Sequence, residues 1–162
     1  MAPLLLGENM HPLLEELYAY HHNASMIIDE VKILLMQLTK NTSPLKENED
    51  LFRLLSVLHD EKERLHHQNE ELIRKRLVAT DVAIHPRILD LERDHDSFYK
   101  IADHLKLLVD SELSRAEILA IIEDYIRKYY DHIDSEENIF FPMADKHLTE
   151  QDWQEIESQW QG

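Results

Sequence analysis

The pattern of apolar positions predicts a chain made almost entirely of amphipathic helices. Leucine, isoleucine, valine and aromatic residues recur three and four positions apart, which places them on one helical face. Proline and clusters such as NTSP (41–44) interrupt this spacing. We therefore expect four long helices and a short last one, over residues 10–40, 48–78, 85–110, 114–146 and 149–160.

Four long amphipathic helices with short connections favour an all-α, up-down-up-down four-helix bundle. The short fifth helix lies at the C-terminal end, where Thr149 can cap it. A length of 162 residues suits one hydrophobic core. We expect a single domain over residues 1–162.

Each apolar stripe contains one or two ionisable residues where an aliphatic residue would belong. Burying an unpaired polar group costs roughly 2–7 kcal/mol, so four such interruptions make sense only if the groups satisfy one another. In an antiparallel bundle they can meet at one level of the core. The interrupting residues are His21, His66, Glu70, His95, His132 and Glu136.

The spacing of these residues predicts a metal site. A histidine and a glutamate four positions apart project from one face of a helix, so two of the helices each present a nitrogen and an oxygen together. Four imidazoles and two carboxylates can hold two metal ions, with the glutamates able to bridge them. Imidazole favours iron, zinc, copper or nickel over calcium or magnesium.

Composition removes several other classes of function. The two glycines lie near the chain ends, which argues against phosphate-binding glycine loops, and the absence of cysteine excludes disulfides and thiolate metal sites. A formal charge of −16 disfavours nucleic-acid binding. The start of the chain does not resemble a signal peptide, and no apolar run is long enough to span a membrane. We expect a cytoplasmic protein.

The segment HIDSEENIFFPMA (132–144) resembles the hemerythrin-like HHE cation-binding family, whose pattern is a histidine, two glutamates four and five positions later, and an apolar-Phe-Pro ending. The resemblance covers nearly the whole chain. It extends to YAYHHNASMII (18–28), HHQNEELIRKRL (66–77), LERDHDSFY (91–99) and ADKHLTEQDW (144–153).

The resemblance implies a non-haem di-iron centre that binds dioxygen, and in some members nitric oxide or peroxide. Its metal ligands fall on the six interrupting residues. Other divalent metals such as zinc or manganese are alternatives to the two iron ions. Two departures from oxygen-carrying hemerythrins favour sensing, reactivity or iron handling over reversible oxygen carriage: Tyr99 replaces a second histidine, and Glu136 replaces an aspartate. Iron storage or buffering, or a plain helical interaction module, are the competing functions.

A one-residue shift of helical phase would put His22 in place of His21, and His67 with Glu71 in place of His66 with Glu70. We expect His22, His67 and Glu137 to point outward, because the apolar stripes continue through His21, His66 and Glu136. Glu137 could instead hold a ligand in place.

Other polar residues on or near the stripes have two interpretations each. We expect His59 and Glu63 to face solvent at the end of the bundle or to cap a helix, with an orienting pair, a proton relay or an extra metal position as the alternative. Tyr99 is expected in the core, although it could donate a hydrogen bond to bound oxygen. Trp153 and Trp160 leave a homodimer open. The remaining histidines are expected at the surface: His11, His85, His104 and His147.

Overall fold

The structure is a computed structural model that describes residues 10–162, apart from the side chains of Ala102 and Lys106. The predicted domain also includes residues 1–9, which lie outside the described residues. Every regular element in the described part is helical, which confirms the all-α prediction. The elements are α1 (Pro12–Thr39), η1 (Leu45–Glu47), α2 (Glu49–Val57), α3 (Glu61–Val78), α4 (Pro86–Val109), α5 (Arg115–Ser135), η2 (Glu136–Phe140), α6 (Phe141–His147) and α7 (Glu150–Gln159).

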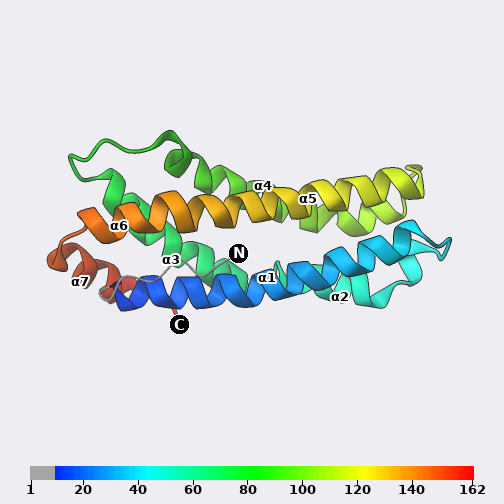
Figure 1. Cartoon of the computed structure of the whole chain (residues 1–162), viewed down its shortest axis with the longest axis horizontal. Coiled ribbons are helices and arrows are strands. Elements are labelled where there is room, and N and C mark those ends of the chain that lie inside the picture. The colour runs from blue at the N-terminus through cyan, green and yellow to red at the C-terminus, as the bar shows by residue number, and fades with distance from the viewer. Residues whose placement is uncertain (1–9) are drawn as a thin grey trace.

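The long helices pack lengthwise into an elongated bundle (Figure 1). Helix α5 packs against α1 and α4, and α1 also contacts α2 and α3. In Figure 1 the chain turns back at the ends of the bundle, and α2 and α3 follow one another along its length. The short helices α6 and α7 close the end that contains the start of α1, where α3 contacts both of them.

Local sequence signals explain where the helices begin. Ser114 and Glu117 form a reciprocal capping box at the start of α5, and Thr149 with Asp152 forms another at the start of α7. Helices α1 and α4 each start with proline behind a histidine whose side chain accepts a backbone N–H. These caps supply acceptors for backbone donors that have no partner inside the helix.

The region 48–78 is two helices, so the prediction of one continuous helix was wrong. The chain leaves the helical path after Leu58, and the Asp60 carboxylate accepts a hydrogen bond from the backbone N–H of Glu63 at 3.0 Å. An acidic side chain at this position provides a strong start for a new helix. The break puts Glu63 in the first turn of α3, where the positive end of the helix dipole favours a carboxylate.

The fourth long helix is also less regular than predicted, because α5 and α6 are joined by a π turn, η2. The N–H of Phe141 donates to the carbonyl of Glu136, and Pro142 has no N–H to continue an ordinary helical ladder. The extra residue in this turn shifts the buried face. Phe140 at the end of the turn and Phe141 and Ala144 beyond it are buried, whereas Ile139 and Met143, which continue the apolar spacing of Glu136, are only partly buried.

Two separate hydrophobic clusters make up the core. One includes Ile28 and Tyr125 towards the end of the bundle formed by α2. The other includes Leu14 and Phe141 towards the end closed by α6 and α7. Between these clusters the long helices turn ionisable residues inward, and this interruption is the candidate site.

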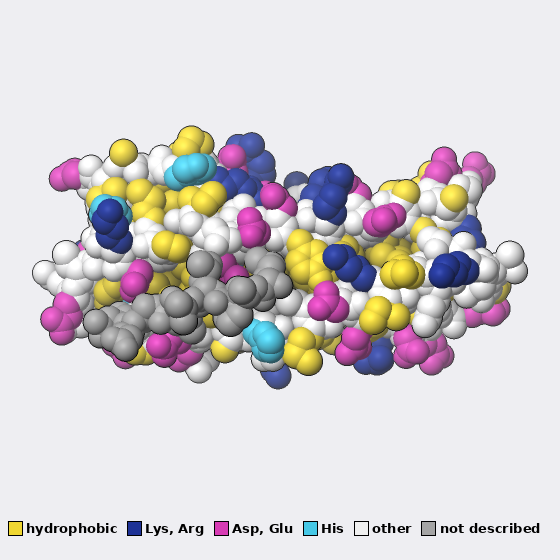
Figure 2. Space-filling model, viewed as in Figure 1, with side chains coloured by type: hydrophobic (Ala, Val, Ile, Leu, Met, Phe, Trp, Pro, Cys, Tyr) yellow, Lys and Arg dark blue, Asp and Glu magenta, His cyan; other side chains and the backbone are white. Residues whose placement is uncertain are grey.

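The surface carries acidic, basic and apolar side chains in scattered positions on the face shown in Figure 2, and imidazoles are visible there only in isolated spots. No described helix combines the length and the apolar character that a membrane span requires.

Candidate metal centre

A layer of eight buried ionisable side chains lies between the two hydrophobic clusters, and we call it the polar layer. None of its members is more than 6% exposed. It contains all six predicted site residues and two others, and its members come from α1, α3, α4, α5 and η2. They are His21, Glu63, His66, His67, Glu70, His95, His132 and Glu136.

Two glutamates connect the histidines of the polar layer. The Nε2 atom of His21 lies 3.6 Å from an oxygen of Glu70 and 3.6 Å from an oxygen of Glu136. The Nε2 atom of His66 lies 3.0 Å from Glu70, and that of His132 lies 2.6 Å from Glu136. Each carboxylate is therefore flanked by at least two imidazoles.

These approaches do not have the geometry of hydrogen bonds. None of the four oxygens of Glu70 and Glu136 accepts a hydrogen bond from any described residue, although all four are shielded from solvent. Leaving a buried carboxylate without a donor is strongly unfavourable. A cation placed among these oxygens and the adjacent nitrogens would remove that cost, so the donor set fits a metal.

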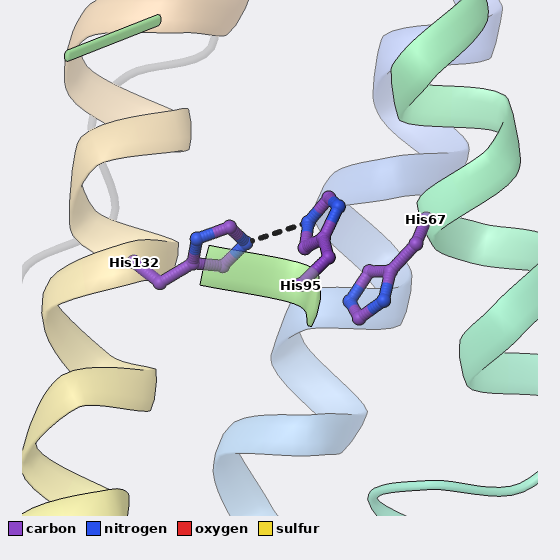
Figure 3. Close-up of side chains that lie close together, drawn as sticks. All are labelled: His67, His95 and His132. Carbon is purple, nitrogen blue, oxygen red and sulfur yellow. Dashed lines mark hydrogen bonds between the residues drawn. The ribbon is translucent and has the colours of Figure 1, made fainter. Parts of the chain in front are cut away.

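His95 and His132 converge from α4 and α5 (Figure 3). Their Nε2 atoms lie 2.9 Å apart and share a hydrogen bond. The Nε2 atom of His95 also lies 3.7 Å from Glu70. Two nitrogens that bind one ion at about 2.0–2.1 Å are roughly 3 Å apart, so this spacing suits a shared metal ion.

The polar layer contains three triplets of residues that share members, and within each triplet the three ligand atoms lie within 4.8 Å of one another. Glu70 belongs to two triplets and so does His95, so the triplets form one continuous site. The triplets are His21–His66–Glu70, Glu70–His95–Glu136 and His67–His95–His132.

Burial keeps most of these imidazoles in the neutral form that binds metals. Desolvation lowers the pKa of His66 and His132 and holds the pKa of His95 well below its usual value. His21 is the exception: burial alone would lower its pKa, but the carboxylates of Glu137 and Glu70 outweigh burial and raise the pKa to about 9. In the metal-free protein, a proton on His21 therefore supplies part of the positive charge that a cation would bring to these carboxylates.

Carboxylates outside the layer hold two of the imidazoles by their outer nitrogens. Nδ1 of His132 is hydrogen-bonded to Asp94 at 2.9 Å, and Arg87 donates to the same carboxylate at 2.7 Å. Nδ1 of His21 is hydrogen-bonded to Glu137 at 3.2 Å. The expectation that Glu137 is simply solvated was wrong, because its partly buried side chain orients a ring, as carboxylates do in metal sites.

The structure also corrects the prediction for His67, which is 5% exposed rather than outward-facing. Successive helical residues lie about 100° apart, and an inward face can be at least that wide. His66 and His67 therefore both fit on the inward side of α3. Nε2 of His67 lies 2.9 Å from Glu63, and Nδ1 is hydrogen-bonded to the Tyr99 hydroxyl at 2.6 Å.

Glu63 is fully buried, so the expectation that it faces solvent was wrong. Its carboxylate accepts hydrogen bonds from the hydroxyls of Tyr20 and Tyr129 and contacts His67. Burial would raise the pKa of Glu63, but His67 first, and then His66 and the Tyr129 hydroxyl, lower it to about 2. The signal in the sequence was the position of Glu63 on the same helical stripe as His66 and Glu70, three and seven residues before them.

His59 is only partly buried and lies outside the polar layer. It is hydrogen-bonded to the Tyr125 hydroxyl at 2.8 Å, and burial lowers its pKa to about 4. His22, by contrast with buried His21, is exposed. His85 and His104 are exposed, and His11 and His147 are partly exposed.

A solvent-open cavity of about 570 Å³ between α3 and α4 reaches the edge of the polar layer. His67, His95 and Tyr99 form part of its wall, together with charged residues such as Arg64 and Asp96. Small molecules can therefore approach the imidazoles from this side.

Imidazoles from α1, α3, α4 and α5 surround two buried carboxylates that accept no hydrogen bond from any described residue. This arrangement is that of a metal-binding helical protein. The sequence model described as Hemerythrin HHE cation binding domain matches residues 12–144, which include the whole polar layer. The chain belongs to this family, whose domains bind metal cations. No curated protein and no solved structure matches the chain.

Proposed function

We propose that the polar layer holds a non-haem di-iron centre and that the protein binds dioxygen, or a related small oxidant or nitrogen oxide, in sensing or stress response. The observation that carries this proposal is the set of four buried oxygens of Glu70 and Glu136 that accept no hydrogen bond from any described residue. His21, His66, His95 and His132 would complete the protein ligands. Iron bound there would supply the electrons and open coordination positions that such molecules require.

The chemistry of the donors supports iron over the alkaline-earth metals. Calcium and magnesium prefer oxygen donors alone, whereas imidazole with carboxylate suits iron and its neighbours. Zinc and manganese remain competitors for the same donors.

The surroundings of the layer support access by a small ligand. The cavity of about 570 Å³ brings solvent to His67, His95 and Tyr99, while the hydrophobic clusters keep water from the other sides. The Tyr99 hydroxyl is directed at His67, which gives the cavity wall a phenolic hydrogen-bond donor. Burial raises the pKa of Tyr99, so the hydroxyl keeps its proton at neutral pH.

Metal analysis of a double variant tests the centre itself. The variant Glu70→Ala with Glu136→Ala should lose iron, whereas the wild type should carry about two ions per chain. The matched control replaces Glu61 and Glu123, exposed glutamates of α3 and α5, by alanine and should keep full loading. Undiminished iron in the first variant, with a retained helical circular-dichroism spectrum, would contradict the proposal.

Rapid mixing tests the small-molecule function. Ferrous-loaded protein mixed with oxygenated or nitric-oxide-containing buffer should develop visible absorption faster than a chelator removes the iron. Iron storage, the competing function, predicts exchange with the chelator and no spectral change on mixing. Exchange of iron with the chelator without a spectral change on mixing would be consistent with the metal site and would refute the small-molecule function.

A further inference from the structure

We propose that His67 is a further metal ligand, which supplies a third imidazole to the ion that His95 and His132 would hold. This inference rests on the proposed function, because it needs an ion at that position. It would give α3 a third metal ligand besides His66 and Glu70, one that the histidine–glutamate spacing of the sequence motif does not include.

The geometry of the three imidazoles carries the inference. A ring nitrogen of His67 lies within 4.8 Å of ring nitrogens of His95 and His132. The rings of His67 and His95 are stacked, with centroids 3.7 Å apart and planes 10° apart. Figure 3 shows the three side chains approaching from three different helices, α3, α4 and α5. Because the lone pair of an imidazole nitrogen lies in the plane of its ring, one of these two stacked rings would have to turn for both to bind the same ion.

The contacts of His67 indicate which of its two nitrogens is available. Nε2 lies 2.9 Å from an oxygen of Glu63, a carboxylate that already accepts from the Tyr20 and Tyr129 hydroxyls, so we assign the ring proton of His67 to Nε2. Nδ1 of His67 then has the free lone pair, and the Tyr99 hydroxyl donates to it at 2.6 Å. A metal ion would take the place of the Tyr99 proton.

Glu63 would keep its position when the ion binds. A ligating histidine commonly donates its other N–H to a carboxylate, which fixes the ring and raises its basicity. Glu63 is fully buried and already held by two phenols, so it is a rigid partner. His67 thus has an orienting carboxylate, as His132 has Asp94 and His21 has Glu137.

A third imidazole on one ion makes the two metal positions unequal. The ion near His21 and His66 would have two imidazoles, and the ion near His95 and His132 would have three. Metal titration of the wild type should therefore proceed in two steps of different affinity.

Cobalt(II) titration of His67→Ala tests the inference, with His22→Ala, an exposed histidine, as the control. His67→Ala should weaken one of the two binding steps by about tenfold or more and leave the other unchanged. Free imidazole should restore that step, because the cavity of about 570 Å³ opens beside His67. Unchanged affinity for both ions would overturn the inference, and so would a loss that imidazole does not reverse.

The variant Tyr99→Phe distinguishes metal binding by His67 from metal binding by the neighbouring Tyr99 hydroxyl. Removing the hydroxyl frees Nδ1, so this variant should bind cobalt as tightly as the wild type or more tightly. A loss as large as that of His67→Ala would place Tyr99 on the metal instead and overturn the inference. A wild-type protein that binds no cobalt would overturn the proposed metal centre, and the assignment of His67 with it, whereas a defect confined to the variants concerns His67 alone.

Nuclear magnetic resonance on the wild type keeps the inference testable even if His67→Ala does not fold. In cobalt-loaded protein each ligating histidine gives one strongly shifted, exchangeable ring N–H signal. Five such signals are expected with His67 bound, from His21, His66, His67, His95 and His132. Four would overturn the inference.

Discussion

The polar layer has two halves that are built differently. The His21 half consists of His21 and His66, and the His95 half consists of His67, His95 and His132, with Glu70 and Glu136 between them. The His21 half is packed against Phe141, with ring centroids 5.4 Å apart. The His95 half borders the cavity between α3 and α4.

The difference between the halves lies in the residues that hold them. One outer carboxylate, Glu137, holds the His21 half. The His95 half is supported at both ends, by Glu63 on His67 and by Asp94 with Arg87 on His132. The half that borders the cavity therefore has more carboxylates beside its imidazoles than the His21 half has.

The largest expected effect comes from removing the residue that both halves share. Glu70 contacts His21 and His66 on one side and His95 on the other, so Glu70→Ala should weaken the binding of both ions by more than about 100-fold. Glu71→Ala, at the neighbouring position on α3, should change neither. Isothermal titration with iron(II) under argon measures both steps, and the loss of only one ion would contradict a shared carboxylate.

A second pair of variants should weaken one half at a time. Asp94→Asn removes the carboxylate behind His132, and Glu137→Gln removes the one behind His21. Each should reduce affinity for a single, different ion by about 10–100-fold, as expected for orienting carboxylates. Combining the two should give an additive loss; if both variants weaken the same binding step, the two halves do not hold separate ions.

The halves should also differ in their pH dependence. The pKa of His21 is raised to about 9, so below that pH a proton competes with the ion in the His21 half. Affinity there should rise by up to about tenfold per pH unit between roughly pH 7 and 9 and then level off. The pKa values of His95 and His132 are lowered, so they are already unprotonated and the His95 half should change little over that range. Calorimetry in buffers of different protonation enthalpy detects the released proton, and two identical pH profiles would contradict the difference.

The smallest expected effect concerns the support of His67. Tyr129→Phe removes a hydrogen bond to buried Glu63 and should lower the free energy of unfolding by about 1.5–3 kcal/mol. Tyr130→Phe removes the hydrogen bond to exposed Asp29 on the surface and should change it by less than about 0.5 kcal/mol. Urea unfolding of the metal-free proteins compares the two; equal losses would mean that Glu63 does not depend on its buried phenols.

The inward direction of the predicted ligands could be read from the sequence because it follows from helical period alone. His21, His95 and the two histidine–glutamate pairs continue apolar stripes, and the structure buries all of them. Their role as ligands stays a prediction. The same helical period also predicted the all-α fold class, because long apolar stripes with few breaks are typical of helices.

Apolar spacing is a poorer guide where more than one residue per turn faces inward. His67 lies within the same inward arc of α3 as His66, and a single stripe cannot represent an arc of about 100°. The π turn before Pro142 shifts the buried face by one residue, and this shift depends on how the helix packs rather than on its spacing. Asp94 was missed because it acts through His132, whereas holding a ligand in place was the alternative considered for Glu137.

A crystal structure of the iron-loaded protein, with anomalous diffraction recorded at the iron edge, tests the central claim most directly. Two iron peaks are expected in the polar layer, both adjacent to Glu70, one beside His21 and His66 and the other beside His95 and His132. A single peak, or none between the two glutamates, would contradict the di-iron centre.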